Sequence, residues 1–246
     1  MASSSSSASV RRADPILANM EKTPPSQEIV VIPASQAHTA SVIFVHGLGQ
    51  TTFTWRAMIL EGLVPHLPHV EWILPQATEK LVTYYRDIRR PSWFDIAVLP
   101  PGADEYDEPG IAESIRIIES LILAQIHRGV DARRIILMGF SQGAALSLMT
   151  ALSTLHDLGG VVSLSGWIPL RARDQTIASP NVPILWCHGI PDPEIPITMA
   201  EDGVAYLRKH VHDKDKTQFK TYPGLMHTIN DDEVNDVLAW LVEQTA

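Results

Sequence analysis

A serine between two glycines is the residue whose type and spacing point most directly to chemistry. Residues 139–143 read Gly-Phe-Ser-Gln-Gly, with Ser141 at the centre. A serine at the tip of a tight strand-to-helix turn has a crowded backbone, so the positions two before and two after it must lack side chains. Gly139 and Gly143 meet this requirement. We therefore predict that Ser141 is a nucleophile, with a plain glycine-rich turn as the alternative.

A serine hydroxyl needs a base to take its proton, and five histidines follow Ser141 in the chain. His227 lies in a loop directly after a predicted strand, where its side chain can reach over the carboxyl edge of a parallel sheet. We predict that His227 is the base; an ordinary loop histidine is the alternative. Of the others, His156 is expected on the helix after the turn, His188 at a strand end, and His210 and His212 at a charged helix end.

The base needs an acid that fixes its tautomer. In folds that carry the nucleophile on such a strand-to-helix turn, the acid lies between the serine and the histidine in the chain. Asp192 follows the apolar strand 183–187, and a proline on each side stiffens its backbone. We predict that Asp192 is this acid. Glu194 is the second candidate, and a simple turn-forming residue is the alternative for both.

Acyl transfer also needs backbone amides aimed at the developing oxyanion. The residue after the nucleophile, Gln142, supplies one amide. The second is expected in the segment His-Gly-Leu-Gly at 46–49, which follows an apolar strand and whose glycines let the backbone turn inward. We predict that Leu48 is the second donor and that His46 braces the loop.

Short apolar runs alternate with longer amphipathic segments along the chain. This alternation predicts one α/β domain over residues 28–246, with a mostly parallel sheet and helices on both faces. The expected strands are 28–32, 41–45, 70–74, 134–138, 160–164, 183–187 and 218–222. Apolar residues at a helical spacing predict two of the helices, the first from Ile111, Ile115, Ile118, Leu121 and Ile122, and the second from Val234, Val237, Leu238 and Leu241.

The segment 75–109 departs from this alternation. It contains five prolines and the aromatic residues Tyr84, Tyr85, Trp93 and Phe94. Long loops in a compact domain are usually functional or disordered, and these aromatic residues give the segment material to pack with. We predict an ordered lid or pocket wall here, and we expect the four aromatic residues, with Trp167, to contact the substrate.

Composition restricts the partners and the compartment. The formal charge of -9 would repel a nucleic acid backbone. Cys187 is the only cysteine and is expected as a small buried hydrophobic residue, which favours a reducing compartment. No uninterrupted apolar stretch is long enough to span a bilayer, and the serine-rich segment 1–27 lacks the apolar core of a secretory signal. We expect a disordered tail at 1–27 and a cytoplasmic protein.

Five segments together resemble one family, the acyl-protein thioesterases, in the phospholipase/carboxylesterase branch of the α/β-hydrolases. They occur in unbroken order as His-Gly-Leu-Gly at 46–49, Pro-Ser-Trp-Phe-Asp at 91–95, Gly-Phe-Ser-Gln-Gly at 139–143, Trp-Ile-Pro-Leu at 167–170 and Cys-His-Gly at 187–189. The resemblance implies a cytosolic serine hydrolase that removes acyl groups from protein cysteines, and often cleaves simple esters. It implies Ser141, Asp192 and His227 as the triad, and the Leu48 and Gln142 amides as the oxyanion hole.

Some residues depart from the family pattern. Gln50 stands where aspartate is usual, Ile190 where a second aspartate is common, and Asp87, Arg89 and Arg90 add charge to a stretch that is largely uncharged in the family. Charges are costly to bury beside an acyl channel, so they must face solvent or narrow the range of acyl chains. The resemblance implies an S-acylated protein or a small acyl ester or thioester as the substrate and allows a peripheral or transient membrane contact, and we expect no metal or organic cofactor. A broad carboxylesterase or lysophospholipase and a non-catalytic binding module are the alternatives.

Overall fold

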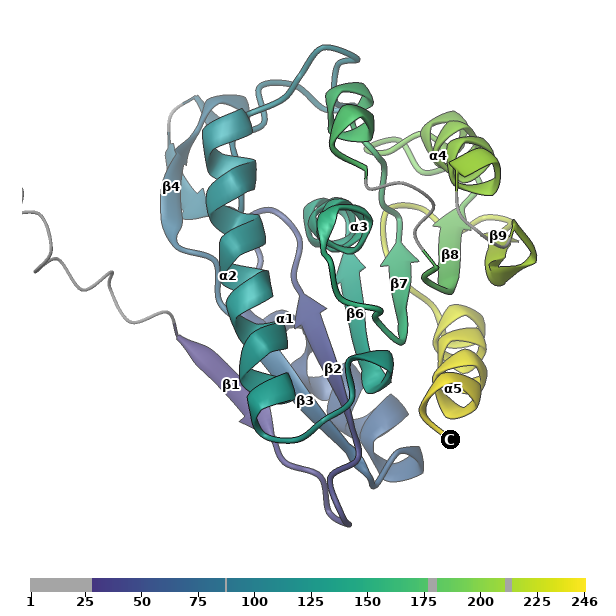
Figure 1. Cartoon of the computed structure of the whole chain (residues 1–246). Coiled ribbons are helices and arrows are strands. Elements are labelled where there is room, and N and C mark those ends of the chain that lie inside the picture. The colour runs from purple at the N-terminus through teal and green to yellow at the C-terminus, as the bar shows by residue number, and fades with distance from the viewer. Residues whose placement is uncertain (1–27, 87, 177–180, 211–213) are drawn as a thin grey trace, which may run out of the picture.

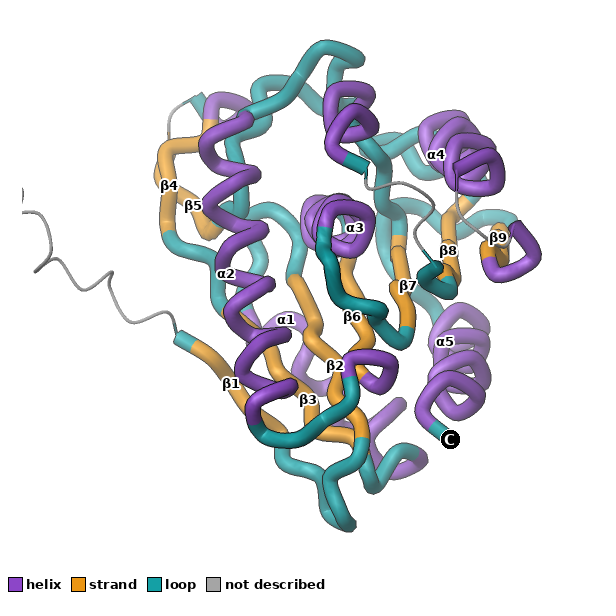
Figure 2. The backbone as a smooth tube through the Cα atoms, viewed as in Figure 1, coloured by secondary structure: helices purple, strands orange, loops and turns teal. Residues whose placement is uncertain are grey.

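The computed structural model describes residues 28–86, 88–176, 181–210 and 214–246. The predicted tail at 1–27, Asp87 and His212 lie outside these residues. A seven-stranded sheet forms the centre of the described chain, as Figures 1 and 2 show, in the order β1-β3-β2-β6-β7-β8-β9. The strands are β1 (Ile29–Ile32), β2 (Ala40–Val45), β3 (Val70–Pro75), β6 (Ile135–Phe140), β7 (Gly160–Leu164), β8 (Ile184–Gly189) and β9 (Thr217–Tyr222).

The mostly parallel sheet predicted from the sequence is confirmed. Only the edge strand β1 runs antiparallel to its neighbour β3, and the other strand pairs of this sheet are parallel. Each predicted strand is present, with ends that differ by at most two residues. β8 continues to Gly189, because His188 and Gly189 pair with Thr221 and Tyr222 of β9.

Helices cover both faces of the sheet, as predicted. One face carries α2 (Glu108–His127), α3 (Gln142–Ser153) and α4 (Ile197–His210), and the other carries α1 (Thr52–Met58), the π-helix η2 (Ile59–Leu63) and α5 (Asp231–Thr245). Successive residues of the central strands alternate between these two apolar layers: Val42 and Phe44 face α1 and α5, whereas Ile43 and Val45 face α2 and α3. Such strands are buried on both faces, which explains their continuous apolar sequence. Short 3-10 turns complete the order, namely η3 (Val64–His66), η4 (Thr83–Tyr85), η5 (Ala132–Arg134), η6 (Leu170–Gln175) and η7 (Lys214–Lys216).

His156 is not on the helix after the nucleophile turn, so that prediction is wrong. Helix α3 ends at Ser153, because Thr154 adopts an extended backbone with φ -69° and ψ 150°. The Thr154 hydroxyl then accepts a hydrogen bond from the His156 amide at 3.2 Å. The chain turns back from there into β7.

The segment 75–109 holds a small antiparallel hairpin that the sequence pattern did not predict. Strands β4 (Glu79–Val82) and β5 (Ile88–Pro91) pair with each other in a sheet of their own. Leu81 and Ile88 on this hairpin are 56% and 53% exposed. The hairpin therefore lacks the alternation of buried apolar and exposed polar residues by which a strand is predicted from sequence. Within the described ranges, no helix is both long and apolar enough to cross a membrane.

Candidate active site

Ser141 sits at the sharp turn between β6 and α3 that the sequence predicted. Its backbone lies in a strained region, with φ 54° and ψ -118°. A Cβ at position 139 would lie 2.4 Å from the carbonyl carbon of Gly143, and a Cβ at position 143 would lie 2.0 Å from the carbonyl oxygen of Val45. Both positions therefore require glycine. The close approach of Gly143 also holds the turn against the end of β2.

His227 and Asp192 form a hydrogen-bonded line with Ser141. The His227 Nε2 atom lies 2.9 Å from Ser141 Oγ, and His227 Nδ1 lies 2.7 Å from Asp192 Oδ2. The three residues follow β6, β8 and β9, whose carboxyl ends meet at one edge of the sheet. A hydrogen bond of 3.0 Å from the Ile190 amide to the Tyr222 carbonyl joins the loops that carry Asp192 and His227.

Asp192 is buried and accepts hydrogen bonds on both carboxylate oxygens. Its Oδ1 atom accepts from the amides of Glu194 at 2.9 Å and Ile195 at 3.0 Å. Burial alone would raise the pKa of Asp192, but the hydrogen bond from His227 and those from the two amides hold it below its usual value. The carboxylate is therefore ionised at neutral pH, and it keeps a proton on His227 Nδ1. His227 Nε2 is left free to accept the proton of Ser141.

His188 supports the loop that carries Asp192, a role that its place at a strand end did not reveal. The side chain is fully buried, and Nε2 donates to the carbonyl oxygen of Ile195 at 2.7 Å. Nε2 also lies 3.7 Å from Asp192 Oδ2. Burial lowers the pKa of His188, so this histidine is neutral beside the carboxylate.

The two amides predicted to form the oxyanion hole, those of Leu48 and Gln142, have no protein acceptor among the described residues. The Leu48 amide belongs to a loop held by the side chain of Gln50, whose Oε1 accepts from the Gly47 amide and from Trp55 Nε1, both at 2.8 Å. The Gln142 amide belongs to the first turn of α3, where a helix leaves its amides unpaired.

His46 lies beneath this loop, where the sequence predicted a bracing role. Its Nε2 accepts hydrogen bonds from the Ala77 amide at 3.0 Å and the Gln76 side chain at 3.1 Å. Since Nε2 accepts, the proton is on Nδ1, which donates to the Gly47 carbonyl at 2.8 Å. Burial lowers the pKa of His46 to about 4, so the ring stays neutral. Both ring nitrogens are thus bonded to neighbouring protein groups, which agrees with a structural role.

Comparison with known proteins identifies the family. The family model described as Phospholipase/Carboxylesterase matches residues 26–244. The chain belongs to the phospholipase/carboxylesterase family. It is therefore a serine hydrolase of the α/β-hydrolase fold, which excludes the alternative of a non-catalytic binding module.

Relatives with thioesterase names cover most of the chain. The acyl-protein thioesterase 1 of Cryptococcus neoformans var. neoformans serotype D is 34% identical over 235 residues, which cover 89% of this chain and 98% of the relative. That of Yarrowia lipolytica is 36% identical over 223 residues, with the same coverage. Among solved structures, Arabidopsis thaliana SOBER1 has a TM-score of 0.78 at 27% identity, covering 85% of this chain and all of its own. Zea mays acyl-protein thioesterase 2 has a TM-score of 0.76 at 26% identity, covering 89% and 99%.

In this member of the family, the side chain of Gln142 ties the nucleophile turn to the segment 75–109. Its Oε1 accepts from the Trp93 amide at 3.1 Å, and its Nε2 donates to the Phe94 carbonyl at 2.7 Å and to Ser92 Oγ at 3.1 Å. The sequence predicted a role only for the backbone amide of Gln142, as a donor to the oxyanion. Residues 92–94 thus form a wall fixed to the residue that follows Ser141.

The five residues predicted to contact the substrate lie in three different places. Trp93 and Phe94 are 1% and 3% exposed, and Trp93 Nε1 donates to the His46 carbonyl at 2.8 Å, so these two rings pack behind the site. Tyr84 and Tyr85 lie at the tip of the hairpin, where Tyr84 is 42% exposed and Tyr85 half-buried beside Gly49.

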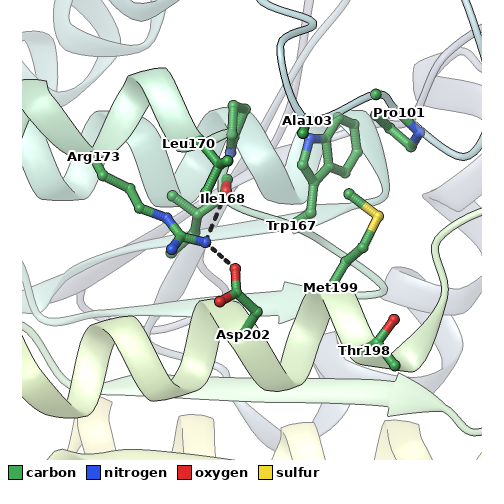
Figure 3. A pocket seen from close by; sticks show the side chains of 11 residues that line it. Pro101, Ala103, Trp167, Ile168, Leu170, Arg173, Thr198, Met199 and Asp202 are labelled. Atoms are coloured by element: carbon green, nitrogen blue, oxygen red, sulfur yellow. Dashed lines mark hydrogen bonds and ion pairs between the residues drawn. The ribbon is translucent and has the colours of Figure 1, made fainter.

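The third place is an apolar cavity of about 260 Å³ lined by Trp167. Figure 3 shows Trp167 there with Pro101, Ala103 and Met199 at one side of the cavity and the Arg173–Asp202 ion pair at the other. The Phe94 and Trp167 rings meet edge to face with their centroids 6.3 Å apart. Phe94 thus contacts both Trp167 of the cavity wall and Gln142 next to Ser141, whereas residues 92–94 and the triad do not line the cavity themselves.

Proposed function

We propose that this hydrolase cleaves acyl thioesters and esters through an acyl-enzyme, and that its main substrates are S-acylated proteins. The observation that carries the proposal is the line of hydrogen bonds from Asp192 through His227 to Ser141. The thioester substrate is favoured by the relatives named acyl-protein thioesterase, which the chain matches over nearly their whole length.

Acylation begins with Ser141. Its Oγ attacks the carbonyl carbon of the thioester while His227 Nε2 takes the hydroxyl proton, and the charge on the carbonyl oxygen is held by the Leu48 and Gln142 amides. The bond from carbon to sulfur then breaks, and the imidazolium returns the proton from Nε2 to the leaving thiolate. Asp192 stabilises the imidazolium between these two transfers.

Deacylation repeats the same steps with water. His227 Nε2 takes a proton from water as its oxygen attacks the acyl carbon, the same amides hold the oxyanion, and the proton passes to Ser141 Oγ as the ester bond breaks. A carboxylic acid leaves and the enzyme returns to its starting state. In this scheme protein groups and water supply every proton and nucleophile.

The acyl chain is proposed to occupy the cavity beside Trp167. Its apolar lining suits a hydrocarbon, and Phe94 links its wall to Gln142 next to the nucleophile. One observation favours the second candidate, a carboxylesterase for shorter chains. The Arg173–Asp202 ion pair borders the cavity, and a long hydrocarbon packed against it would displace its hydration at a cost.

The membrane contact predicted from the sequence belongs to the same proposal, as does the cytoplasmic location. The hairpin β4–β5 exposes Leu81, Tyr84 and Ile88 together with the cationic side chains of Arg89 and Arg90. Leu81 and Arg89 lie on one face of the hairpin, and Ile88 and Arg90 lie on the other. Exposed apolar and cationic groups on one hairpin favour transient adsorption to anionic lipid. Sedimentation with vesicles containing anionic lipid should recover the protein, and replacing Leu81 and Ile88 with serine should reduce the bound fraction. Equal binding of both proteins would contradict this contact.

Replacement of the nucleophile tests the function. Ser141→Ala should abolish hydrolysis of a palmitoyl-thioester peptide and of a short-chain ester, while its circular dichroism spectrum stays unchanged. Ser120→Ala is the matched control, because Ser120 is an exposed serine on α2 whose hydroxyl only donates to the Ile117 carbonyl. Substantial turnover by Ser141→Ala would contradict the mechanism. Comparing kcat/KM over acyl chains of increasing length distinguishes the two candidate functions.

A further inference from the structure

Glu194 lies beside the reacting nitrogen of the histidine, and the mechanism above does not use it. The sequence made it the second candidate for the acid, which would place it at His227 Nδ1. The structure instead places Glu194 Oε2 3.7 Å from His227 Nε2, the nitrogen that faces Ser141. Nδ1 is already bound to Asp192. Glu194 is therefore on the substrate side of the imidazole.

The position of Glu194 is fixed by its backbone. The Glu194 and Ile195 amides both donate to Asp192 Oδ1, at 2.9 and 3.0 Å, and prolines precede and follow this pair in the chain. A turn with two such bonds and two prolines has little conformational freedom. The backbone from which the Glu194 side chain extends is thus fixed near the triad by the same turn that presents Asp192.

The carboxylate of Glu194 is partly exposed beside His227. Its side chain is 52% exposed, and among the residues that the structure describes no lysine or arginine lies within ion-pair distance of it. Arg90, a cation of the hairpin, lies over the Tyr85 ring, 5.8 Å from its centroid. A solvent-accessible negative charge therefore stands beside the nitrogen that faces Ser141.

The leaving group must pass this charge. In acyl transfer the protonated Nε2 donates to the departing sulfur or oxygen, so the atoms attached to that sulfur lie within a few ångströms of Nε2 and of Glu194. For an S-acylated protein, these atoms belong to the cysteine and its neighbours in the chain. For other esters, they belong to the alcohol.

We propose that Glu194 is a specificity-determining residue that selects leaving groups by charge, favouring acylated cysteines flanked by lysine or arginine and disfavouring anionic leaving groups. The inference rests on the proposed function, because it assigns the Nε2 side of His227 to the leaving group. Two unit charges about 6 Å apart in a largely aqueous setting change a rate about three- to tenfold. The preference should weaken as salt rises, since the Debye length falls to about 8 Å at physiological ionic strength.

The test uses one acyl chain on three peptides that differ only beside the cysteine, with lysine, glutamine or glutamate. The wild-type enzyme should give a kcat/KM about three- to tenfold higher for the lysine peptide than for the glutamine peptide at low salt, and lowest for the glutamate peptide. Glu194→Gln should remove this order and Glu194→Lys should reverse it. Glu243→Gln, which removes an exposed carboxylate of α5, is the matched control and should keep the wild-type order.

Other outcomes would overturn the proposal. If Glu194→Gln keeps the wild-type order, or loses activity equally on all three peptides, Glu194 does not select by charge; an equal loss would indicate that it positions His227 or Asp192. A neutral p-nitrophenyl ester separates this failure from failure of the proposed function. Wild-type turnover of that ester with no charge preference among the peptides overturns the inference alone, whereas no turnover of any substrate overturns both.

Discussion

Glu233 should make the stability of this enzyme depend on pH. It lies in the first turn of α5, where its amide donates to the side chain of Asn230 at 2.9 Å. Its own side chain is 1% exposed against Met138 and Leu164, and in the described structure neither carboxylate oxygen has a hydrogen-bond partner. Burial, with smaller contributions from nearby Asp192 and Asp236, raises the pKa of Glu233 from 4.5 to about 8.

The sign and size of the effect follow from this pKa. Between pH 4.5 and 8 the folded protein holds a proton that the unfolded chain releases, so the free energy of unfolding falls as pH rises and levels off above pH 8. At about 1.36 kcal/mol for each pKa unit, Glu233 should cost roughly 3 to 4 kcal/mol of stability between pH 5 and pH 8.

The substitution Glu233→Gln isolates this contribution, because glutamine keeps the shape of the protonated acid and does not titrate. Urea unfolding of both proteins from pH 5 to pH 9 should give similar stabilities near pH 5 and a variant that is more stable by several kcal/mol at pH 8. Glu243→Gln should follow the wild type at every pH, since that residue is exposed. If the wild type and Glu233→Gln differ by the same amount at every pH, Glu233 does not titrate as the structure indicates.

Three further predictions concern the site. Asp192→Asn should lower kcat by about 10⁴-fold with the fold intact, because asparagine cannot stabilise the imidazolium; a loss of less than tenfold in a steady-state assay would contradict its role. Gly143→Ala should prevent folding or sharply lower the unfolding midpoint, since its Cβ would lie 2.0 Å from the Val45 carbonyl oxygen; a wild-type midpoint would contradict the close approach. Gln142→Leu should cost about 1–3 kcal/mol for each polar group of residues 92–94 left unpaired, measured by urea unfolding; an unchanged midpoint would show that these groups find other partners.

The candidate triad could be predicted because chain order and strand ends constrain it. Ser141 and Asp192 follow apolar strands, and His227 follows the more polar edge strand β9. In a parallel sheet the carboxyl ends of such strands meet at one edge, where the structure brings the three residues together. The turn at Ser141 requires glycine at positions 139 and 143 for steric reasons, and these two glycines can be read directly from the sequence.

What the sequence did not reveal depends on which way side chains point. The hairpin β4–β5 is mostly exposed, with Val82 its one buried strand residue, so it has no apolar alternation. Trp93 and Phe94 could as well have lined a pocket, and only packing shows that they are buried. Glu194 was the second candidate for the acid, but the turn that points Asp192 at Nδ1 carries Glu194 to the opposite nitrogen. Glu233 reads as a common residue of a first helical turn, and its burial comes from the packing of α5 against the sheet.

The measurement that most directly tests the central claim is the mapping of a fluorophosphonate adduct by peptide mass spectrometry. The probe reacts with a serine whose proton is taken by a neighbouring base. The phosphoryl oxygen of the probe is held in the oxyanion hole during this reaction. One adduct on Ser141 is expected in the wild type, with stoichiometric loss of ester hydrolysis, and labelling should fall steeply in His227→Ala. An adduct on another serine, or full activity in a protein whose Ser141 is labelled, would contradict the assignment of Ser141 as the nucleophile.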